Sequence, residues 1–168
     1  MVDNIKEACQ TMYQPSQKIT VDERMIKSKG RVLFKQYMPK KPTKWGIKVF
    51  AVCDSTTSYN WEFDIYTGQA VPGQQDHGLT MAVVLRLMEH FHNQRYICFT
   101  DNYYTSPALA VALMERGIHL IGTCKKDRRN WPEALKNAKF FECHSARGDM
   151  RYILWIIFCV NSGKISVL

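Results

Sequence analysis

The sequence predicts a mixed α/β fold, in which helices cover a sheet that contains both antiparallel and parallel strands. Patterns typical of strands dominate the first half of the chain and alternate with helical patterns in the second half. Of the 168 residues, 46% are hydrophobic, enough for one domain with a sizeable core. Only 9 Gly and 6 Pro occur, which excludes collagen-like, low-complexity and wholly disordered chains.

The first half of the chain is predicted to hold one helix followed by three strands. The helix is expected over residues 3–12. A short apolar strand, Ile19–Val21, runs into Asp22, which closes it. The second strand, Ile47–Cys53, is apolar apart from one Lys, as expected of a buried strand. In the third, residues 59–66, aromatic and aliphatic residues alternate with polar ones, and this period of two indicates a half-buried strand.

Helical and strand patterns alternate in the second half. After a Gly-containing loop over residues 67–78, apolar residues recur at helical spacing in Leu79–His92. Tyr96–Thr100 is a short apolar strand that ends at Asp101. The remaining expected elements are a strand at Ile118–Thr123, one helical turn at 131–133, and one or two strands within 138–160.

One further helix has clear start and stop signals. Ser106 can act as the N-cap, Pro107 fits the first turn, and Gly117 supplies the residue after the helix end. Three strands in succession favour an antiparallel meander, whereas the strand–helix–strand units that follow require parallel pairing. This order of elements matches the ribonuclease H-like fold, although a fold alone does not establish a function.

The chain is basic, with 23 Lys and Arg against 15 Asp and Glu, a formal charge of +8. Such a balance on a compact domain suggests a polyanionic partner, with nucleic acid ahead of a membrane surface. The alternative is a basic protein whose charge serves only its solubility. Positive residues gather in two places, a segment over 27–48 with Pro and Gly that favour an exposed loop, and a cluster after Thr123. The predicted DNA contacts are Lys29, Arg31, Lys40, Lys41, Lys44, Lys48, Lys125, Arg128 and Arg129.

Two acids, Asp22 and Asp101, each follow a predicted strand. Ligand sites in open α/β sheets lie at the carboxyl ends of strands, and neighbouring strands are about 4.8 Å apart. If the two strands are neighbours, both carboxylates could bind one Mg²⁺ or Mn²⁺, which prefer oxygen ligands and support phosphodiester chemistry. The alternative is structural: Asp22 begins a turn, and Asp101 forms an Asx turn with Asn102.

Several other classes of function are not indicated. The 6 Cys are scattered without the spacing of a zinc site. Neither a phosphate-binding Gly loop nor a nucleophile elbow occurs. The N-terminus does not resemble a signal peptide, and the longest apolar stretch, Ile153–Val160, is too short to cross a bilayer. We therefore expect an intracellular protein with reduced thiols, no membrane partner and no small-molecule cofactor.

A set of short motifs, taken together, resembles the catalytic core of piggyBac-type transposases and their domesticated derivatives. The resemblance covers roughly residues 5–155, in the order of the family. The motifs are Val21–Met25, Lys29–Arg31, Gln36–Pro39, Lys41–Pro42, Lys44–Lys48, Tyr66–Gly68, Thr100–Ser106 and Gly122–Thr123, with Arg129 and Pro132 after them. Each motif alone would be weak, but the set is specific.

The resemblance implies a ribonuclease H-like DDE/D domain over residues 1–168 that cleaves DNA strands and joins them in a metal-dependent reaction. Asp22 matches the first catalytic aspartate and Asp101 the second, with Mg²⁺ or Mn²⁺ as the cofactor. The implied partner is DNA, either transposon ends or duplex of any sequence, and a homodimer and a nuclear location are also implied.

This sequence also departs from the family. No residue matches the third catalytic aspartate; Asp149 fits a hairpin turn instead, and the tail over 156–168 is atypical. These departures predict a core that is incomplete at its C-terminus and does not transpose alone. Three alternatives stay open: a domesticated, non-catalytic DNA-binding protein, a nuclease that uses two acids, and a degenerate product without activity.

Overall fold

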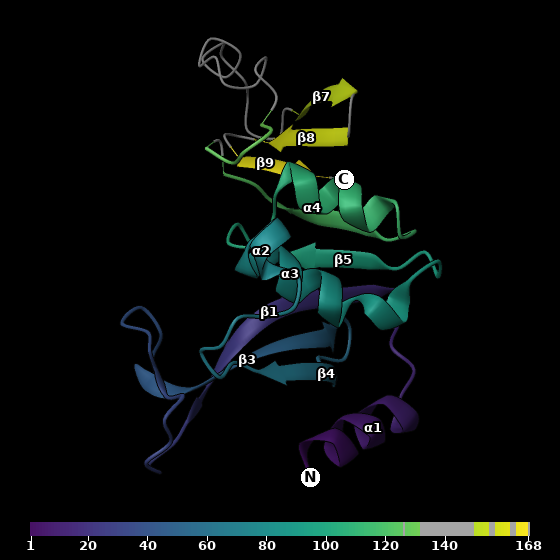
Figure 1. Ribbon diagram of the computed structural model, residues 1–168. Coiled ribbons are helices and arrows are strands. Elements are labelled where there is room, and N and C mark those ends of the chain that lie inside the picture. The colour runs from purple at the N-terminus through teal and green to yellow at the C-terminus, as the bar shows by residue number, and fades with distance from the viewer. Residues whose placement is uncertain (126, 132–149, 155–156, 162–163, 168) are drawn as a thin grey trace. The chain divides into compact units, whose positions relative to one another are not determined.

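The structure is a computed structural model of residues 1–168, and it describes all of them except 126, 132–149, 155–156, 162–163 and 168 (Figure 1). The side chains of β7–β9 also lie outside the described part. The chain divides into two units, residues 1–90 and 91–168, which we describe in turn.

The first unit is built around the long strand β3. Its elements are α1 (Val2–Met12), β1 (Lys18–Lys27), β2 (Gln36–Tyr37), β3 (Trp45–Asp54), β4 (Asn60–Ile65), α2 (Gln74–His77) and α3 (Leu79–Leu87). β3 pairs antiparallel with β1, β2 and β4. Its ladder with β1 runs without interruption from the pair Ile19–Asp54 to the pair Lys27–Gly46. The antiparallel meander expected from the sequence is therefore confirmed.

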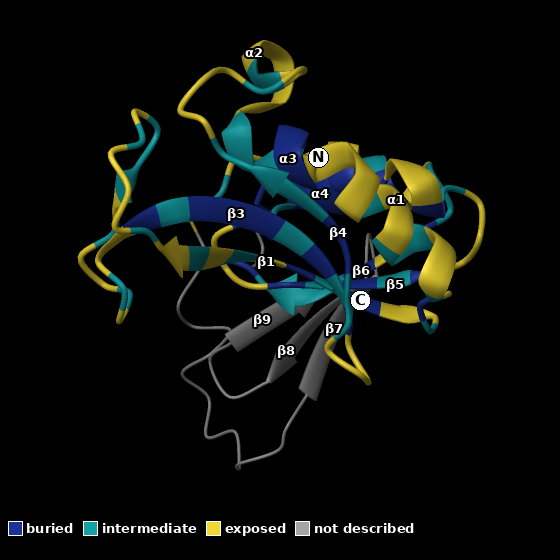
Figure 2. Ribbon diagram, turned by 90° about the horizontal axis from the view of Figure 1, so that it is seen from below, coloured by how far each residue is buried: buried dark blue, intermediate teal, exposed yellow. Residues whose placement is uncertain are grey.

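Burial in this unit alternates at the start of β1, whereas consecutive residues are buried in β3 and β4. Ile19 and Val21 of β1 and Phe50 and Val52 of β3 are buried, and Figure 2 shows β3 buried along most of its length. Helix α3 packs on β3 and β4 and buries a broad apolar face. Burial of such apolar faces is the main source of stability for elements this short.

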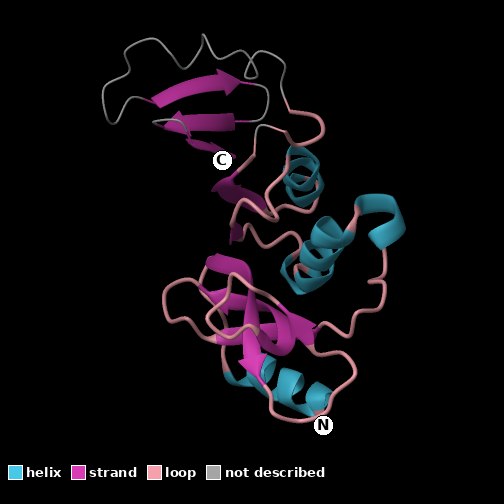
Figure 3. Cartoon of the chain, turned by 90° about the vertical axis from the view of Figure 1, so that its left-hand side faces the viewer, coloured by secondary structure: helices cyan, strands magenta, loops and turns pink. Residues whose placement is uncertain are grey.

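Helix α1 lies beside the strands of the first unit (Figure 3) and is attached to β4 by charged groups. The Lys6 ammonium is 3.1 Å from the Glu62 carboxylate and 2.9 Å from the Asp64 carboxylate. Arg86 of α3 also binds Asp64. These ion pairs join α1 and α3 to the same strand. Because the Glu62 and Asp64 carboxylates are largely shielded from solvent, salt screens these ion pairs less than it screens fully exposed ones.

Asp54, at the end of β3, organises the turn into β4. Its side chain is 1% exposed, and Oδ1 accepts hydrogen bonds from the amides of Thr56 (2.7 Å) and Thr57 (2.9 Å). Oδ2 accepts from the Ser16 amide at 2.5 Å and from the Tyr13 hydroxyl at 3.2 Å. Burial by itself would raise the pKa of Asp54, but these hydrogen bonds favour the charged form and hold the pKa well below its usual value.

The second unit combines a parallel strand–helix–strand motif with an antiparallel group. Its elements are η1 (Glu89–Phe91, which begins in the first unit), β5 (Ile97–Thr100), α4 (Pro107–Met114), β6 (His119–Thr123), β7 (Met150–Leu154), β8 (Ile157–Asn161) and β9 (Lys164–Val167). β5 and β6 pair in parallel, with α4 as the connection. β6 pairs antiparallel with β9, β9 with β8, and β8 with β7.

The predicted signals of helix α4 are confirmed. The Ser106 hydroxyl accepts a hydrogen bond from the Leu109 amide at 3.2 Å, and Pro107 is the first helical residue. Gly117 has a φ of +70°, the left-handed conformation that follows many helices. The mixed α/β class is confirmed as well, since both antiparallel and parallel pairing occur and helices pack on the strands.

Some element boundaries differ from the prediction. β1 continues to Lys27, so Asp22 lies in mid-strand rather than at a strand end, because β3 supplies hydrogen-bond partners beyond the apolar residues. The segment over 27–48 contains β2 and the start of β3, and a short helix, α2, forms within the predicted loop over 67–78. Helix α3 ends at Leu87, short of the predicted His92. The turn expected at 131–133 falls largely outside the described residues.

Replacing Asp54 with Asn should destabilise the protein by about 2 kcal/mol, because the hydrogen bonds lose a charged acceptor and the new NH₂ group faces donors. The native pKa lies below the unfolded value of about 3.9. The stabilisation is therefore complete at neutral pH and is lost as the pH falls through the native pKa. Urea denaturation at pH 7 and near pH 3 should show the difference between wild type and variant shrinking with acid. Asp127→Asn, at an exposed acid, serves as control; equal effects of both variants at pH 7 would contradict the prediction.

Candidate functional site

Asp22 lies on an exposed face of β1. It pairs in register with Ala51 of β3, and its Oδ1 accepts a hydrogen bond from the Glu23 amide at 2.7 Å. The structural alternative, in which Asp22 begins a turn, is wrong because the ladder continues past it. Thr20, Asp22 and Arg24 alternate along the strand and share one face, since successive side chains point to opposite faces.

A pocket of about 240 Å³ lies beside Asp22 on this face. It is lined by Thr20, Asp22, Glu23, Arg24, Ala51, Cys53, Asp54, Ser55 and Ser58. The Thr20 and Ser55 hydroxyls are 2.8 Å apart in this lining. The pocket therefore combines exposed carboxylate oxygen, hydroxyls and a guanidinium, which are groups suited to a cation and to phosphate oxygens.

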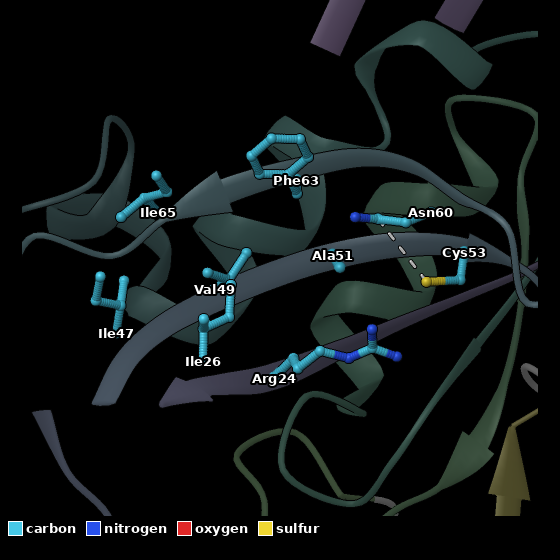
Figure 4. Close-up of a pocket in the computed structure, with 9 residues that line it drawn as sticks. All are labelled: Arg24, Ile26, Ile47, Val49, Ala51, Cys53, Asn60, Phe63 and Ile65. Carbon is cyan, nitrogen blue, oxygen red and sulfur yellow. Dashed lines mark hydrogen bonds between the residues drawn. The ribbon is translucent and has the colours of Figure 1, made fainter. Parts of the chain in front are cut away.

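A second pocket, also of about 240 Å³, continues along the sheet and is mostly apolar (Figure 4). It shares Arg24, Ala51 and Cys53 with the first pocket; its other lining residues are Ile26, Ile47, Val49, Asn60, Phe63 and Ile65. Burial raises the pKa of the Cys53 thiol, although the nearby Arg24 charge opposes this. Because its thiol is kept protonated and lies 3.9 Å from the side-chain oxygen Oδ1 of Asn60, Cys53 is not suited to act as a nucleophile.

Asp101 directly follows β5 and is exposed. Its Oδ1 accepts a hydrogen bond from the Tyr103 amide at 2.9 Å, so the Asx turn considered for this residue is present. Within the described part of the chain, Oδ2 has no hydrogen-bond partner. The turn thus fixes the direction of the carboxylate and leaves one oxygen for a ligand.

The hydroxyls of Thr100 and Thr105 stabilise the turn that begins at Asp101. The Thr100 and Thr105 hydroxyls are 2.7 Å apart, and Thr105 Oγ1 also lies 2.7 Å from the Asp101 carbonyl oxygen, to which it donates. The Thr105 amide donates to the same carbonyl at 3.0 Å. Gly122 of β6 lies against this pair; a Cβ there would lie 2.5 Å from the Thr100 carbonyl oxygen and would also collide with Thr105 Oγ1.

Asp22 belongs to the first unit and Asp101 to the second. No group of three or more His, Cys, Asp and Glu side chains gathers at metal-binding distance in the described part of the chain. The donor chemistry nevertheless fits Mg²⁺ or Mn²⁺, because both acids present exposed carboxylate oxygens rather than buried or thiolate ligands.

Six of the nine predicted DNA contacts have exposed side chains: Lys29, Arg31, Lys40, Lys44, Lys125 and Arg129. Lys41 forms an ion pair of 3.1 Å with Glu23. Lys48 belongs to the predicted strand Ile47–Cys53 and was also chosen as a DNA contact; it is 8% exposed within β3, with its ammonium 4.6 Å from the Phe50 ring centroid. Burial lowers its pKa, and the charge of Glu23 opposes this. Arg128 donates to backbone carbonyls of the Asp101 turn.

An aromatic pair lies within the basic segment. Tyr37 and Trp45 face each other across β2 and β3 with ring centroids 4.8 Å apart. They are 52% and 57% exposed, so both rings remain accessible. Aromatic rings between positive side chains are common in surfaces that bind nucleic acid, where bases stack on the rings.

Thiol chemistry is disfavoured at the two fully described cysteines of the second unit. Burial raises the pKa of Cys98 to about 12 and of Cys124 to about 11, so both stay protonated near neutral pH. None of the described helices is long and apolar enough to cross a bilayer.

Sequence reasoning missed Arg24, Thr105 and Gly122 as parts of these surroundings. Arg24 could not be placed on the face of Asp22, because the predicted strand ended at Asp22. Thr105 and Gly122 lie in two of the family motifs, but their structural role was not readable, because it depends on a contact between residues 17 positions apart.

The chain matches proteins of known family. A family model described as Transposase IS4 matches residues 1–165. The human piggyBac transposable element-derived protein 3 is 27% identical over 132 residues, which are 76% of this chain and 22% of that protein. The human chimeric ERCC6-PGBD3 protein is also 27% identical over 132 residues, 12% of its length. The chain therefore spans about a fifth or less of the curated relatives it matches.

A solved structure agrees in fold. It is described as a cryo-EM structure of the piggyBac transposase synaptic complex with hairpin DNA, and it matches with a TM-score of 0.73 and 29% identity. The match covers 90% of this chain and 31% of that chain. It agrees with the ribonuclease H-like mixed sheet predicted from the order of elements.

Replacing Gly122 with Ala should destabilise the protein by about 3 kcal/mol, since the new methyl group would collide with backbone that cannot move without shifting β5. Urea denaturation measures the loss, and hydrogen exchange should show faster exchange at the Thr105 amide. Gly30→Ala is the matched control, because a Cβ there would meet only side-chain atoms at 3.6 Å or more. A Gly122 variant as stable as this control would refute the proposed steric constraint.

Proposed function

This chain belongs to the Transposase IS4 family, and we propose that it forms part of the catalytic core of a piggyBac-type DNA transposase. The reaction is hydrolysis of a phosphodiester at a transposon end, followed by attack of the freed 3′-hydroxyl on another phosphodiester. The observation that supports this most strongly is the match of 90% of the chain to a transposase solved as a complex with hairpin DNA. The exposed carboxylates of Asp22 and Asp101, which the sequence resemblance matches to the family's first two acids, fit that chemistry.

Asp22 and Asp101 are proposed to hold Mg²⁺ or Mn²⁺. Such an ion, when bound, activates the attacking oxygen and stabilises the leaving oxygen of a phosphodiester. Asp101 contributes a carboxylate whose Oδ1 is already fixed by the Tyr103 amide, which lowers the entropic cost of binding a ligand at Oδ2. Asp22 offers a carboxylate on a strand whose backbone is held by β3.

Arg24 lies two residues beyond Asp22 on the same face and lines the same pocket. A guanidinium in that place can bind a non-bridging phosphate oxygen of the substrate by a charge-assisted hydrogen bond. In this role Arg24 orients the phosphodiester beside the Asp22 carboxylate.

DNA is the proposed partner, and the basic segment over 27–48 is its proposed contact. The exposed Lys29, Arg31, Lys40 and Lys44 supply positive charge that binds phosphates without reading sequence. Tyr37 and Trp45 add exposed ring surface among these charges. Lys48 is assigned a structural role instead, since its ammonium is buried against Phe50.

A second function is favoured by the same surface: a DNA-binding module without catalysis. No residue of this sequence matches the family's third acid, so we expect the 168-residue chain by itself to bind metal and DNA without strand transfer. A nuclear location and a homodimer remain part of the proposal. A cleavage assay with Mg²⁺ on hairpin and nicked DNA separates an active nuclease from the binding module.

We expect Mn²⁺ binding by the wild-type chain, measured by calorimetry, to be lost in Asp22→Asn, in Asp101→Asn and in the double variant. If one ion uses both carboxylates, each single variant should lose nearly as much as the double variant, a non-additive result. Asp76→Asn, at an exposed acid of α2, is the control and should bind like wild type. The same heat for the wild type and the double variant would refute the metal site.

Loss of Lys40 and Lys44 should reduce the salt dependence of DNA binding. Because each phosphate contact contributes about 0.9 to the slope of log K against log[salt], the double Ala variant should lower that slope by about 1.8. Fluorescence anisotropy with a labelled duplex, over 50–200 mM salt, measures it. Lys18→Ala removes an exposed charge from the opposite end of β1 and should leave the slope unchanged. An unchanged slope in the double variant would place the DNA contact elsewhere.

A further inference from the structure

Arg128 belongs by sequence to the second basic cluster, yet its guanidinium binds the protein's own backbone. Nη2 donates a hydrogen bond to the Asn102 carbonyl at 3.1 Å and another to the Tyr103 carbonyl. Its Nε is buried and has no acceptor in the described part of the chain. Removing part of the guanidinium from water costs free energy, and the hydrogen bonds from Nη2 to the two carbonyls offset that cost.

The peptide that Arg128 binds is the one that holds Asp101. The Asn102 carbonyl and the Tyr103 amide are two ends of a single peptide group. The carbonyl accepts from Arg128 at 3.1 Å, and the amide donates to Asp101 Oδ1 at 2.9 Å. A cation at the carbonyl polarises the peptide and makes its N–H a stronger donor, because hydrogen bonds in a chain reinforce one another.

The neighbouring Arg129 provides a contrast within the same cluster. It is exposed and forms no hydrogen bond in the described part of the chain. Sequence alone cannot distinguish two adjacent arginines after a strand, and both were predicted to bind DNA. In the structure the two differ: the Arg129 side chain is exposed and can bind phosphates, whereas the Arg128 guanidinium is hydrogen-bonded to the turn after Asp101.

We propose that Arg128 is a positioning residue, which fixes the Asp101 carboxylate through the Asn102–Tyr103 peptide so that Oδ2 can bind a divalent cation. The metal-binding part of this inference rests on the proposed function. The orientation of the carboxylate does not, because it follows from the hydrogen bonds of the turn.

Hydrogen exchange of the Tyr103 amide, followed by NMR, tests the orientation without metal. Arg128→Gln should raise the exchange rate about tenfold, since the amide loses the polarising cation and the turn loosens. Arg128→Lys keeps a cationic donor and should restore part of the protection, and Arg129→Gln should match wild type. Arg128→Lys also preserves most of the packing. If Arg128→Gln folds poorly, the Tyr103 exchange rate can therefore still be compared between wild type and Arg128→Lys.

Mn²⁺ titration of the same four proteins tests the consequence for the site. Loss of a group that orients a ligand lowers metal affinity by about tenfold or more, which we expect for Arg128→Gln, with partial rescue by Lys. Arg129→Gln should bind Mn²⁺ like wild type but lose part of the salt-dependent DNA binding that Arg128→Gln retains.

The outcomes separate the two proposals. Unchanged Tyr103 exchange in Arg128→Gln and Arg128→Lys overturns the positioning role. Faster exchange in Arg128→Gln together with Mn²⁺ binding that is insensitive to Asp101→Asn supports the positioning of the carboxylate and overturns the metal site of the proposed function. Weaker Mn²⁺ binding in Arg129→Gln than in Arg128→Gln also overturns the inference.

Discussion

The position of Asp101 in the second unit depends on a close contact between β6 and the end of β5. At Gly122 only a hydrogen atom separates β6 from the Thr100 carbonyl and the Thr105 hydroxyl. That contact permits the Thr100–Thr105 hydroxyl pair to close beneath the Asp101 turn. The carboxylate is therefore placed by backbone and hydroxyl hydrogen bonds rather than by packing of its own side chain. An arrangement of this kind fixes the backbone around the carboxylate and leaves the carboxylate exposed, which suits the binding of a hydrated cation proposed for it.

In the first unit the corresponding constraint is the ladder between β1 and β3. Asp22 has no supporting turn, so its backbone position comes from pairing on both sides of it along β1. Strand alternation then places Arg24 beside it and turns Val21 and Glu23 to the other face. The same ladder brings Gly46 against the Ile26 carbonyl, where a side chain would not fit. Thus a single register positions the acid, the neighbouring guanidinium and the start of the basic segment.

The sequence predicted the fold class and most elements because these depend on local patterns. The strand within residues 59–66 and the capping signals around Ser106 are each readable within one segment, and both elements were confirmed. The predicted alternation of burial along that strand was not, because Glu62 is buried whereas Phe63 and Ile65 are half-buried. The extent of β1 was not readable, since residues 23–27 are largely polar and become a strand only because β3 pairs with them. Asp22 and Asp101 could be chosen from the sequence, but the Asx turn, the Gly122 contact and the buried Asp54 depend on residues distant along the chain.

The net charge suggested a polyanionic partner, but the number of basic side chains overstates how many are available to contact one. Of the nine cationic residues chosen, Lys48 is buried against Phe50, Lys41 is paired with Glu23, and Arg128 binds carbonyls. A positive charge that is already hydrogen-bonded within the protein must give up those bonds to bind a phosphate, so it adds less to affinity than an exposed one. Of the nine, the cations left for the proposed DNA contact are therefore the exposed ones of the 27–48 segment together with Lys125 and Arg129. The remaining three stabilise the strands and the turn that present the two acids.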